Sequence, residues 1–61
     1  MKIRELRIRA GLTQVQLADR MNVNQSTVSQ WESGKTKPLR KIRKTLAQVL
    51  GCTVDELLKE E

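Results

Sequence analysis

The chain has 61 residues, a net charge of +5, one cysteine and no histidine. A chain of this length forms one small domain, which we place at residues 1–61, and it buries only about 60% of the surface that its unfolded form exposes. It has little room for a pocket, and catalysis or metal binding through histidine and paired cysteines is excluded. We therefore expect no enzyme activity, no metal, no cofactor and no small-molecule ligand.

The charge is distributed unevenly along the sequence. Residues 1–44 hold eleven Lys/Arg and three Asp/Glu, whereas residues 45–61 hold one Lys and four Asp/Glu. Such a basic surplus favours nucleic-acid binding, although a solubilising surface gives the same count. No apolar run is long enough for a membrane span, no signal peptide is evident, and a lone cysteine suits a reducing compartment. We expect a cytoplasmic protein that does not bind membranes.

The hydrophobic pattern predicts five helices, over about residues 2–10, 13–21, 24–33, 39–50 and 54–60. Ile3, Leu6 and Ala10 recur at helical spacing in the first, which Gly11 ends as a left-handed cap. No run with a period of two predicts a strand. The fold class is therefore all-α.

The second and third helices are joined by a tight turn. Thr13 begins the second helix with a capping box that Gln16 completes, and the predicted buried face is Val15, Leu17, Ala18 and Met21. Asn22 suits a turn that needs a positive φ, and Asn24 is a strong N-cap for the third helix. Ala18 is small enough for two helices to cross closely.

Two further helices complete the domain. After Pro38, an inward stripe is formed by Leu39, Ile42, Leu46, Val49 and Leu50. Gly51 ends this helix. Thr53 and Glu56 form a second capping box, which begins a short helix with Leu57 and Leu58 turned inward.

The outer face of the third helix is polar and uncharged, and it consists of Gln25, Ser26, Thr27, Ser29 and Gln30. Amides and hydroxyls of this kind can donate to and accept from base edges in a DNA major groove. A polar helix face without a reading role is the alternative. Trp31 is assigned to the core rather than to base stacking, because it follows Val28 at inward spacing.

The chain resembles the Cro and phage-repressor class of helix-turn-helix proteins, the XRE-like family. The resemblance covers about residues 2–58 and is carried by Leu6-Arg7, Gly11-Leu12-Thr13-Gln14, Leu17-Ala18, Val28-Ser29-Gln30-Trp31-Glu32, Gly34-Lys35, Pro38 and Val54-Asp55-Glu56-Leu57-Leu58. Two positions depart from the family pattern: Asn22 stands where glycine is usual, and Leu39 where a polar cap is usual. The resemblance implies a compact five-helix bundle of the lambda-repressor-like DNA-binding type.

The resemblance also implies residue roles. Gln25 would be the first base reader, supported by Gln14, and Ser26, Ser29 and Gln30 would read neighbouring bases, with Thr27 beside them. The phosphate contacts would be Gln14, Asn24, Lys35, Lys37 and Arg40. Arg7 and Glu32 match a structural ion pair, although Arg7 could instead bind a phosphate. Arg43 and Lys44 could join the phosphate set or form a solvated face.

The predicted function is sequence-specific binding of double-stranded DNA by a transcriptional regulator, with repression as the expected outcome. We expect a homodimer on a palindromic operator, with half-sites about 34 Å apart. Val54, Leu57 and Leu58 with the acidic tail are the candidate dimer surface, although core packing explains these leucines equally well. The alternative is a protein-binding module, such as an antitoxin or anti-repressor partner, or the reading part of a longer regulator.

Overall fold

Five α-helices make up the regular structure of this computed structural model, which describes residues 1–59. They are α1 (Ile3–Arg9), α2 (Gln14–Met21), α3 (Gln25–Ser33), α4 (Arg40–Leu50) and α5 (Val54–Leu58). No strand occurs in this described part of the chain, and the predicted all-α class is confirmed. Within the same residues, no helix has the length and apolarity that a membrane span requires.

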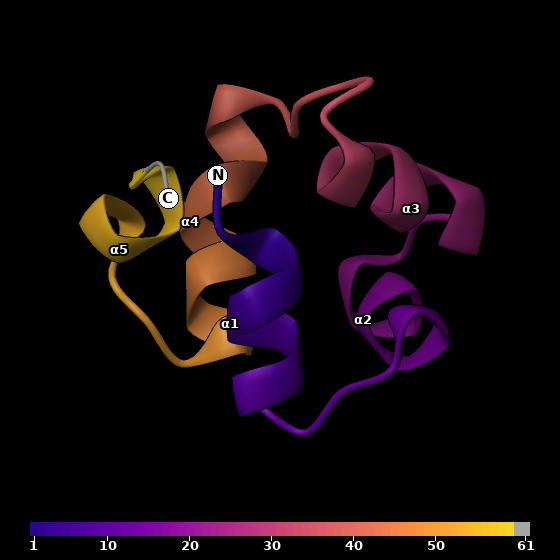
Figure 1. Ribbon diagram of the computed structural model, residues 1–61, viewed down its shortest axis with the longest axis horizontal. Helices are drawn as coiled ribbons and strands as arrows, with labels where there is room; N and C mark the ends of the chain where they lie inside the picture. The colour runs from indigo at the N-terminus through magenta and orange to yellow at the C-terminus, as the bar shows by residue number, and fades with distance from the viewer. Residues whose placement is uncertain (60–61) are drawn as a thin grey trace.

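The helices pack around α4, which lies behind α1 in the centre of Figure 1. α2 packs on both α3 and α4, α1 packs on α3, and α5 packs on α4. The pair α2 and α3 occupies one side of the molecule and α5 the opposite side (Figure 1). The backbone N–H of Lys2 donates to the carbonyl of Leu57 at 3.1 Å, which joins the start of the chain to α5.

The helix ends follow the predicted local chemistry at most positions. The Thr13 hydroxyl accepts from the Gln16 N–H at 3.1 Å, and the Gln16 side chain accepts from the Thr13 N–H at 2.9 Å. The second capping box, between Thr53 and Glu56, is also present. Asn22 ends α2 in the left-handed region with φ 58°, where asparagine is one of the few side chains that fit without large strain.

Several predicted helix ends differ from the structure by a residue or more, and α2 and α3 each begin one residue later than predicted, after their N-caps. α4 begins at Arg40 rather than at Leu39, which stands outside the helix as its N-cap. α5 ends at Leu58, so Lys59 is not helical, and residue 60 of the predicted helix lies outside the described residues. Asn24 is the N-cap of α3, but its side chain makes no capping hydrogen bond. α1 is also shorter at both ends than predicted.

The core is one continuous apolar cluster drawn from all five helices: Ile3, Leu6, Leu17, Ala18, Val28, Trp31, Leu46, Ala47, Leu50 and Leu57. Ala18 is 3% exposed where α2 crosses α3, as its size predicts. Trp31 is buried, which confirms its assignment to the core.

Four apolar residues predicted to face inward are exposed. They are Ala10, Val15, Leu39 and Leu58, with Val15 49% and Leu39 63% exposed. At 100° per residue, Val15 lies about 110° from the centre of the Leu17–Ala18 stripe, too far round α2 to reach the core. Leu39 precedes its helix, so helical periodicity does not direct its side chain. Leu58 is the last residue of α5, turned away from Leu57.

Candidate nucleic-acid interface

An ion pair joins α1 to α3 at the centre of the candidate site. The Arg7 Nε lies 2.6 Å from the Glu32 Oε2, and its Nη2 lies 3.4 Å from the Oε1. The third guanidinium nitrogen, Nη1, donates to the Leu12 carbonyl at 2.8 Å, just before α2. The two side chains are only 12% and 6% exposed. Arg7 is therefore occupied by the protein itself, which favours the structural role over a phosphate contact.

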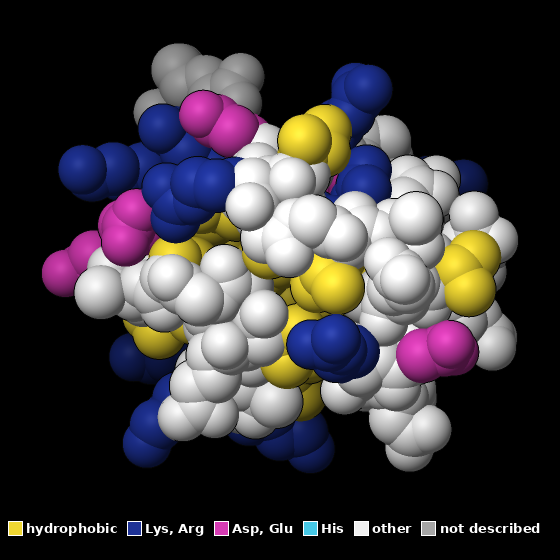
Figure 2. All heavy atoms as spheres, turned by 90° about the horizontal axis from the view of Figure 1, so that it is seen from below, with side chains coloured by type: hydrophobic (Ala, Val, Ile, Leu, Met, Phe, Trp, Pro, Cys, Tyr) yellow, Lys and Arg dark blue, Asp and Glu magenta, His cyan; other side chains and the backbone are white. Residues whose placement is uncertain are grey.

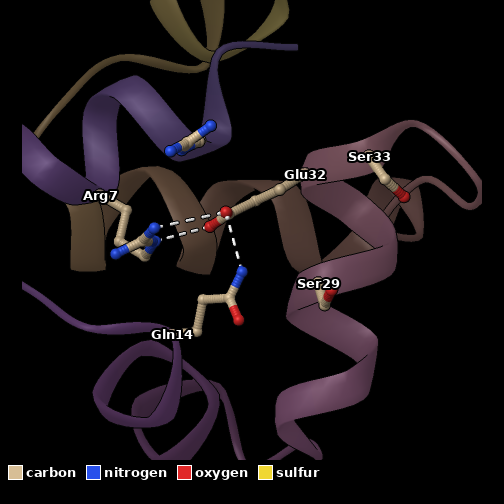
Figure 3. A pocket seen from close by; sticks show the side chains of 6 residues that line it. Arg7, Gln14, Ser29, Glu32 and Ser33 are labelled. Carbon is tan, nitrogen blue, oxygen red and sulfur yellow. Dashed lines mark hydrogen bonds and ion pairs between the residues drawn. The ribbon is translucent and has the colours of Figure 1, made fainter.

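Gln14, the first residue of α2, connects this ion pair to the first residue of α3. Its Nε2 donates to the Glu32 Oε1 at 3.1 Å (Figure 3). Its Oε1 accepts from the Gln25 Nε2 at 3.4 Å. A chain of side-chain hydrogen bonds therefore runs from Arg7 through Glu32 and Gln14 to Gln25, the first residue of α3. Gln25 itself is exposed.

A notch of about 300 Å³ opens beside this chain, between α1, α2 and α3. It is lined by Arg4, Arg7, Gln14, Ser29, Glu32 and Ser33 (Figure 3). The charge of Arg7 is neutralised by Glu32, whereas Arg4 is exposed and has no carboxylate partner among residues 1–59. The notch therefore carries a net positive charge. Sequence reasoning did not select Arg4, although its place one turn before Arg7 puts both on one side of α1.

The five predicted base readers lie in the first two turns of α3. Gln25, Ser26 and Ser29 are exposed, and Thr27 and Gln30 are half-buried. The structure brings Gln25 to Gln14 and places Ser29 at the notch. Their chemistry is uniform, because every member can both donate and accept a hydrogen bond.

The remaining predicted phosphate contacts flank α3 on both sides. Asn24, Lys35, Lys37 and Arg40 are exposed, and the three cations have no ion-pair partner within residues 1–59. The loop that carries the lysines is anchored at both ends. The Lys35 N–H donates to the Gln30 carbonyl at 3.0 Å, and the Arg43 Nε donates to the Pro38 carbonyl at 3.2 Å. Arg43 is thus a half-buried loop anchor rather than part of a solvated face, whereas Lys44 is exposed.

Charge alone does not locate the interface. On the face drawn in Figure 2, seen from below Figure 1, basic side chains lie at several separate points rather than in one block. The notch and the hydrogen-bonded chain are the features that distinguish the α2–α3 side.

Two other predictions concern residues outside this site. Leu57 is fully buried in the core, so it is unavailable to the predicted dimer surface, and Val54 is half-buried against the same core. The acidic tail that was to join that surface includes residues 60 and 61, which lie outside the described residues. Among residues 1–59, no cluster of three His, Cys, Asp or Glu side chains is placed to hold a metal ion.

The sequence relationships agree with this geometry. The family model described as helix-turn-helix matches residues 3–57. The chain belongs to the helix-turn-helix family. The resemblance found in the sequence is thereby confirmed.

Two relatives extend over almost the whole chain. It is 40% identical over 60 residues to the HTH-type transcriptional activator BcrR of Enterococcus faecalis, a match that spans 98% of this chain and 29% of that protein. It is 32% identical over 56 residues to an uncharacterized HTH-type transcriptional regulator of Archaeoglobus fulgidus, spanning 92% of this chain and 80% of that protein. The chain thus covers under a third of the first relative's length. No solved structure matches this chain significantly.

Proposed function

We propose that this chain binds double-stranded DNA in a sequence-dependent manner and regulates transcription, with α3 in the major groove. The observation that carries the proposal is the hydrogen-bonded chain that ends at exposed Gln25. It holds an amide at the start of a helix whose outer face is uncharged and able to donate and accept. Such a face suits base edges, which offer both donors and acceptors.

Phosphate binding accounts for the groups around α3. The first turns of α2 and α4 present backbone N–H groups and the positive end of a helix dipole. Lys35, Lys37 and Arg40 add positive charge that no carboxylate within residues 1–59 neutralises, and we add Arg4 at the notch to this set. The Gln14 Nε2 uses one of its two hydrogens on Glu32. The other hydrogen and the backbone N–H of Gln14 are the groups that would hold a phosphate.

One domain reads only a few base pairs, so we propose a homodimer on a palindromic operator with half-sites about one helical turn apart. Occupancy of such a site lowers or raises transcription according to its position. We propose repression as the simplest outcome, although the Enterococcus relative is named an activator. The site of action would be the nucleoid, in the cytoplasm.

Selection from a randomised duplex library with the purified protein tests the proposal directly. Recovery of a short palindrome with half-sites one turn apart is the expected result. Recovery of no preferred sequence, with binding that is lost as salt rises, would contradict base reading. A protein partner, such as the toxin of a toxin–antitoxin pair, would then be the better hypothesis.

Two alanine variants separate base reading from phosphate binding. Gln25→Ala should cost about 1–3 kcal/mol on the selected duplex and relax the preference at one base pair. Lys35→Ala should weaken binding to all sequences alike and lower the salt slope by about 1. The measurement is a titration of fluorescent duplexes between 50 and 200 mM salt, over which the parent protein should lose roughly 10³-fold in affinity if it neutralises six to eight phosphates. Identical behaviour of the two variants on every duplex would refute the assigned roles.

A further inference from the structure

The hydrogen-bonded chain from Arg7 to Gln25 has a direction, and Glu32 sets it. A carboxylate only accepts hydrogen bonds, and a guanidinium only donates them. Gln14 must therefore turn its Nε2 toward Glu32, at 3.1 Å, and this leaves its Oε1 facing α3. Gln25 must in turn direct its own Nε2 to that oxygen, at 3.4 Å. The order of nitrogen and oxygen in both amides thus follows from the charge of residue 32.

This order limits what Gln25 can offer to a base. One hydrogen of its Nε2 is used on Gln14, and the second hydrogen and the Oε1 remain at the exposed edge. Adenine presents a matching pair in the major groove, the N6 donor and the N7 acceptor, whereas guanine presents two acceptors. A two-bond contact forms only when the donor and acceptor stand in the correct order. An amide held in the reverse order at the same place would set donor against donor and acceptor against acceptor.

We propose that the Arg7–Glu32 ion pair determines base specificity: it fixes the amide order of Gln25, so that adenine is favoured over guanine at the base pair that Gln25 reads. The inference rests on the proposed DNA binding. Glu32 is a positioning residue, because its side chain is only 6% exposed and acts through Gln14 rather than on the base. Arg7 orients the Glu32 carboxylate by two hydrogen bonds.

Glu32→Gln should reverse the order of donors and acceptors in the hydrogen bonds that run from residue 32 through Gln14 to Gln25. The Arg7 Nε at 2.6 Å demands an oxygen from residue 32, so the introduced NH₂ group would face Gln14. The Gln14 Oε1 would accept a hydrogen bond from that group, and the Gln14 Nε2 would face Gln25. Gln25 would then turn its Oε1 toward Gln14 to accept from it. The exposed edge of Gln25 would carry the opposite order. The variant changes one charge and hardly alters side-chain volume.

The test compares binding of the parent and of variants to a duplex pair. The duplexes carry adenine or guanine at the position where Gln25→Ala relaxes the preference. We expect the parent to favour adenine by about tenfold or more, and Glu32→Gln to lower this ratio to that of Gln25→Ala or below it, because the reversed amide opposes adenine's donor and acceptor. The matched control is Glu56→Gln, which removes the carboxylate of the exposed Arg9–Glu56 pair on the far side of the molecule. Glutamine preserves that capping box, so the control should keep the parental ratio.

Gln14→Ala keeps the proposal testable should Glu32→Gln fail to fold, as judged by thermal unfolding followed by circular dichroism. It removes the side chain that links Glu32 to Gln25 by hydrogen bonds but leaves the Arg7–Glu32 ion pair intact. The Gln25 amide is then free to turn. The adenine-to-guanine ratio should fall. Where Glu32→Gln does fold, adding it to Gln14→Ala should change the ratio no further. A parental ratio in both single variants, or an equal loss of affinity on both duplexes, overturns the inference. No preferred sequence for the parent itself would instead overturn the proposed function.

Discussion

Cys52 is half-buried where the chain passes from α4 to α5, packed against the core. Burial raises the pKa of its thiol above the usual value, and the Glu56 carboxylate raises it further, while Arg9 opposes the change. The folded protein therefore holds the thiol proton to higher pH than the unfolded chain does. Deprotonation of Cys52 thus disfavours the folded state.

This shift predicts a pH dependence of stability. Its contribution is fully present below the unfolded thiol's pKa of about 9.0 and is lost as the pH rises through the folded value. The free energy of unfolding should therefore fall more steeply above this pH in the parent than in Cys52→Ser, measured by urea unfolding at several pH values. Alkylation by iodoacetamide should also be slower in the folded protein than in urea at the same pH. Parallel pH profiles for the two proteins would argue against the shift.

Gln14 and Val15 show how far the sequence allowed the position of individual side chains to be predicted. Apolar character assigned Val15 to the core, yet the helical angle places Gln14 on the side of Leu17 and Ala18, where it meets Glu32. The family pattern suggested a contact between Gln14 and Gln25, and the structure contains it. Arg4 was not selected. Its spacing from Arg7 places both residues on one side of α1, but that this side faces α3 depends on tertiary packing, which the local sequence does not specify.

At the scale of the helix, α2 and α3 begin in different ways. Thr13 closes a complete capping box at the start of α2, whereas Asn24 holds the N-cap position of α3 without a side-chain hydrogen bond. The first turn of α3 thus has less local support from its cap. We infer that the packing of Val28 and Trp31, rather than Asn24, stabilises that turn.

The difference predicts unequal costs for the same kind of substitution. Thr13→Ala should destabilise the protein by about 1 kcal/mol, because it frees a backbone N–H that the hydroxyl satisfies. Asn24→Ala should cost less than half as much. Urea unfolding of both variants, compared at the transition midpoint, gives the two values. Equal losses would mean that Asn24 caps α3 in solution.

Most helix ends could be predicted because their chemistry is local. The capping boxes and Asn22 act within a few residues of sequence, and the structure contains each of them. The start of α4 could not be placed in this way. Leu39 offers no side-chain cap, and the preceding loop is positioned by buried Pro38 and by the bond from Arg43. Those contacts exist only after the helices have packed.

At the scale of the whole molecule, stability rests on a core that comprises ten apolar residues among residues 1–59, without a disulfide. Domains in general are stable by only about 5–15 kcal/mol, and a small core places this one toward the low end. Leu46 is fully buried at the centre of α4, whereas Leu39 at its start is 63% exposed. The two leucines therefore form a matched pair for testing how much the core contributes.

Leu46→Ala should cost about 2–5 kcal/mol, since it removes buried methyl groups and leaves a cavity. In a domain of this size the midpoint of thermal unfolding should fall by roughly 10 °C or more. Leu39→Ala should change it little. Melting curves followed by circular dichroism give the midpoint of each variant. A comparable fall in the midpoint for both variants would place Leu39 in the core, as its sequence spacing had predicted.

The hydrogen bond between Lys2 and Leu57 has a practical consequence for anyone handling this protein. It ties the start of the chain to α5, which lies on the opposite side of the molecule from α3 (Figure 1). An affinity tag, a fluorescent protein or a dimerising zipper joined to the chain after α5 would therefore follow an element that lies opposite α3. A fusion at that end should leave α3 uncovered, so this domain can be joined through α5 to different partner domains.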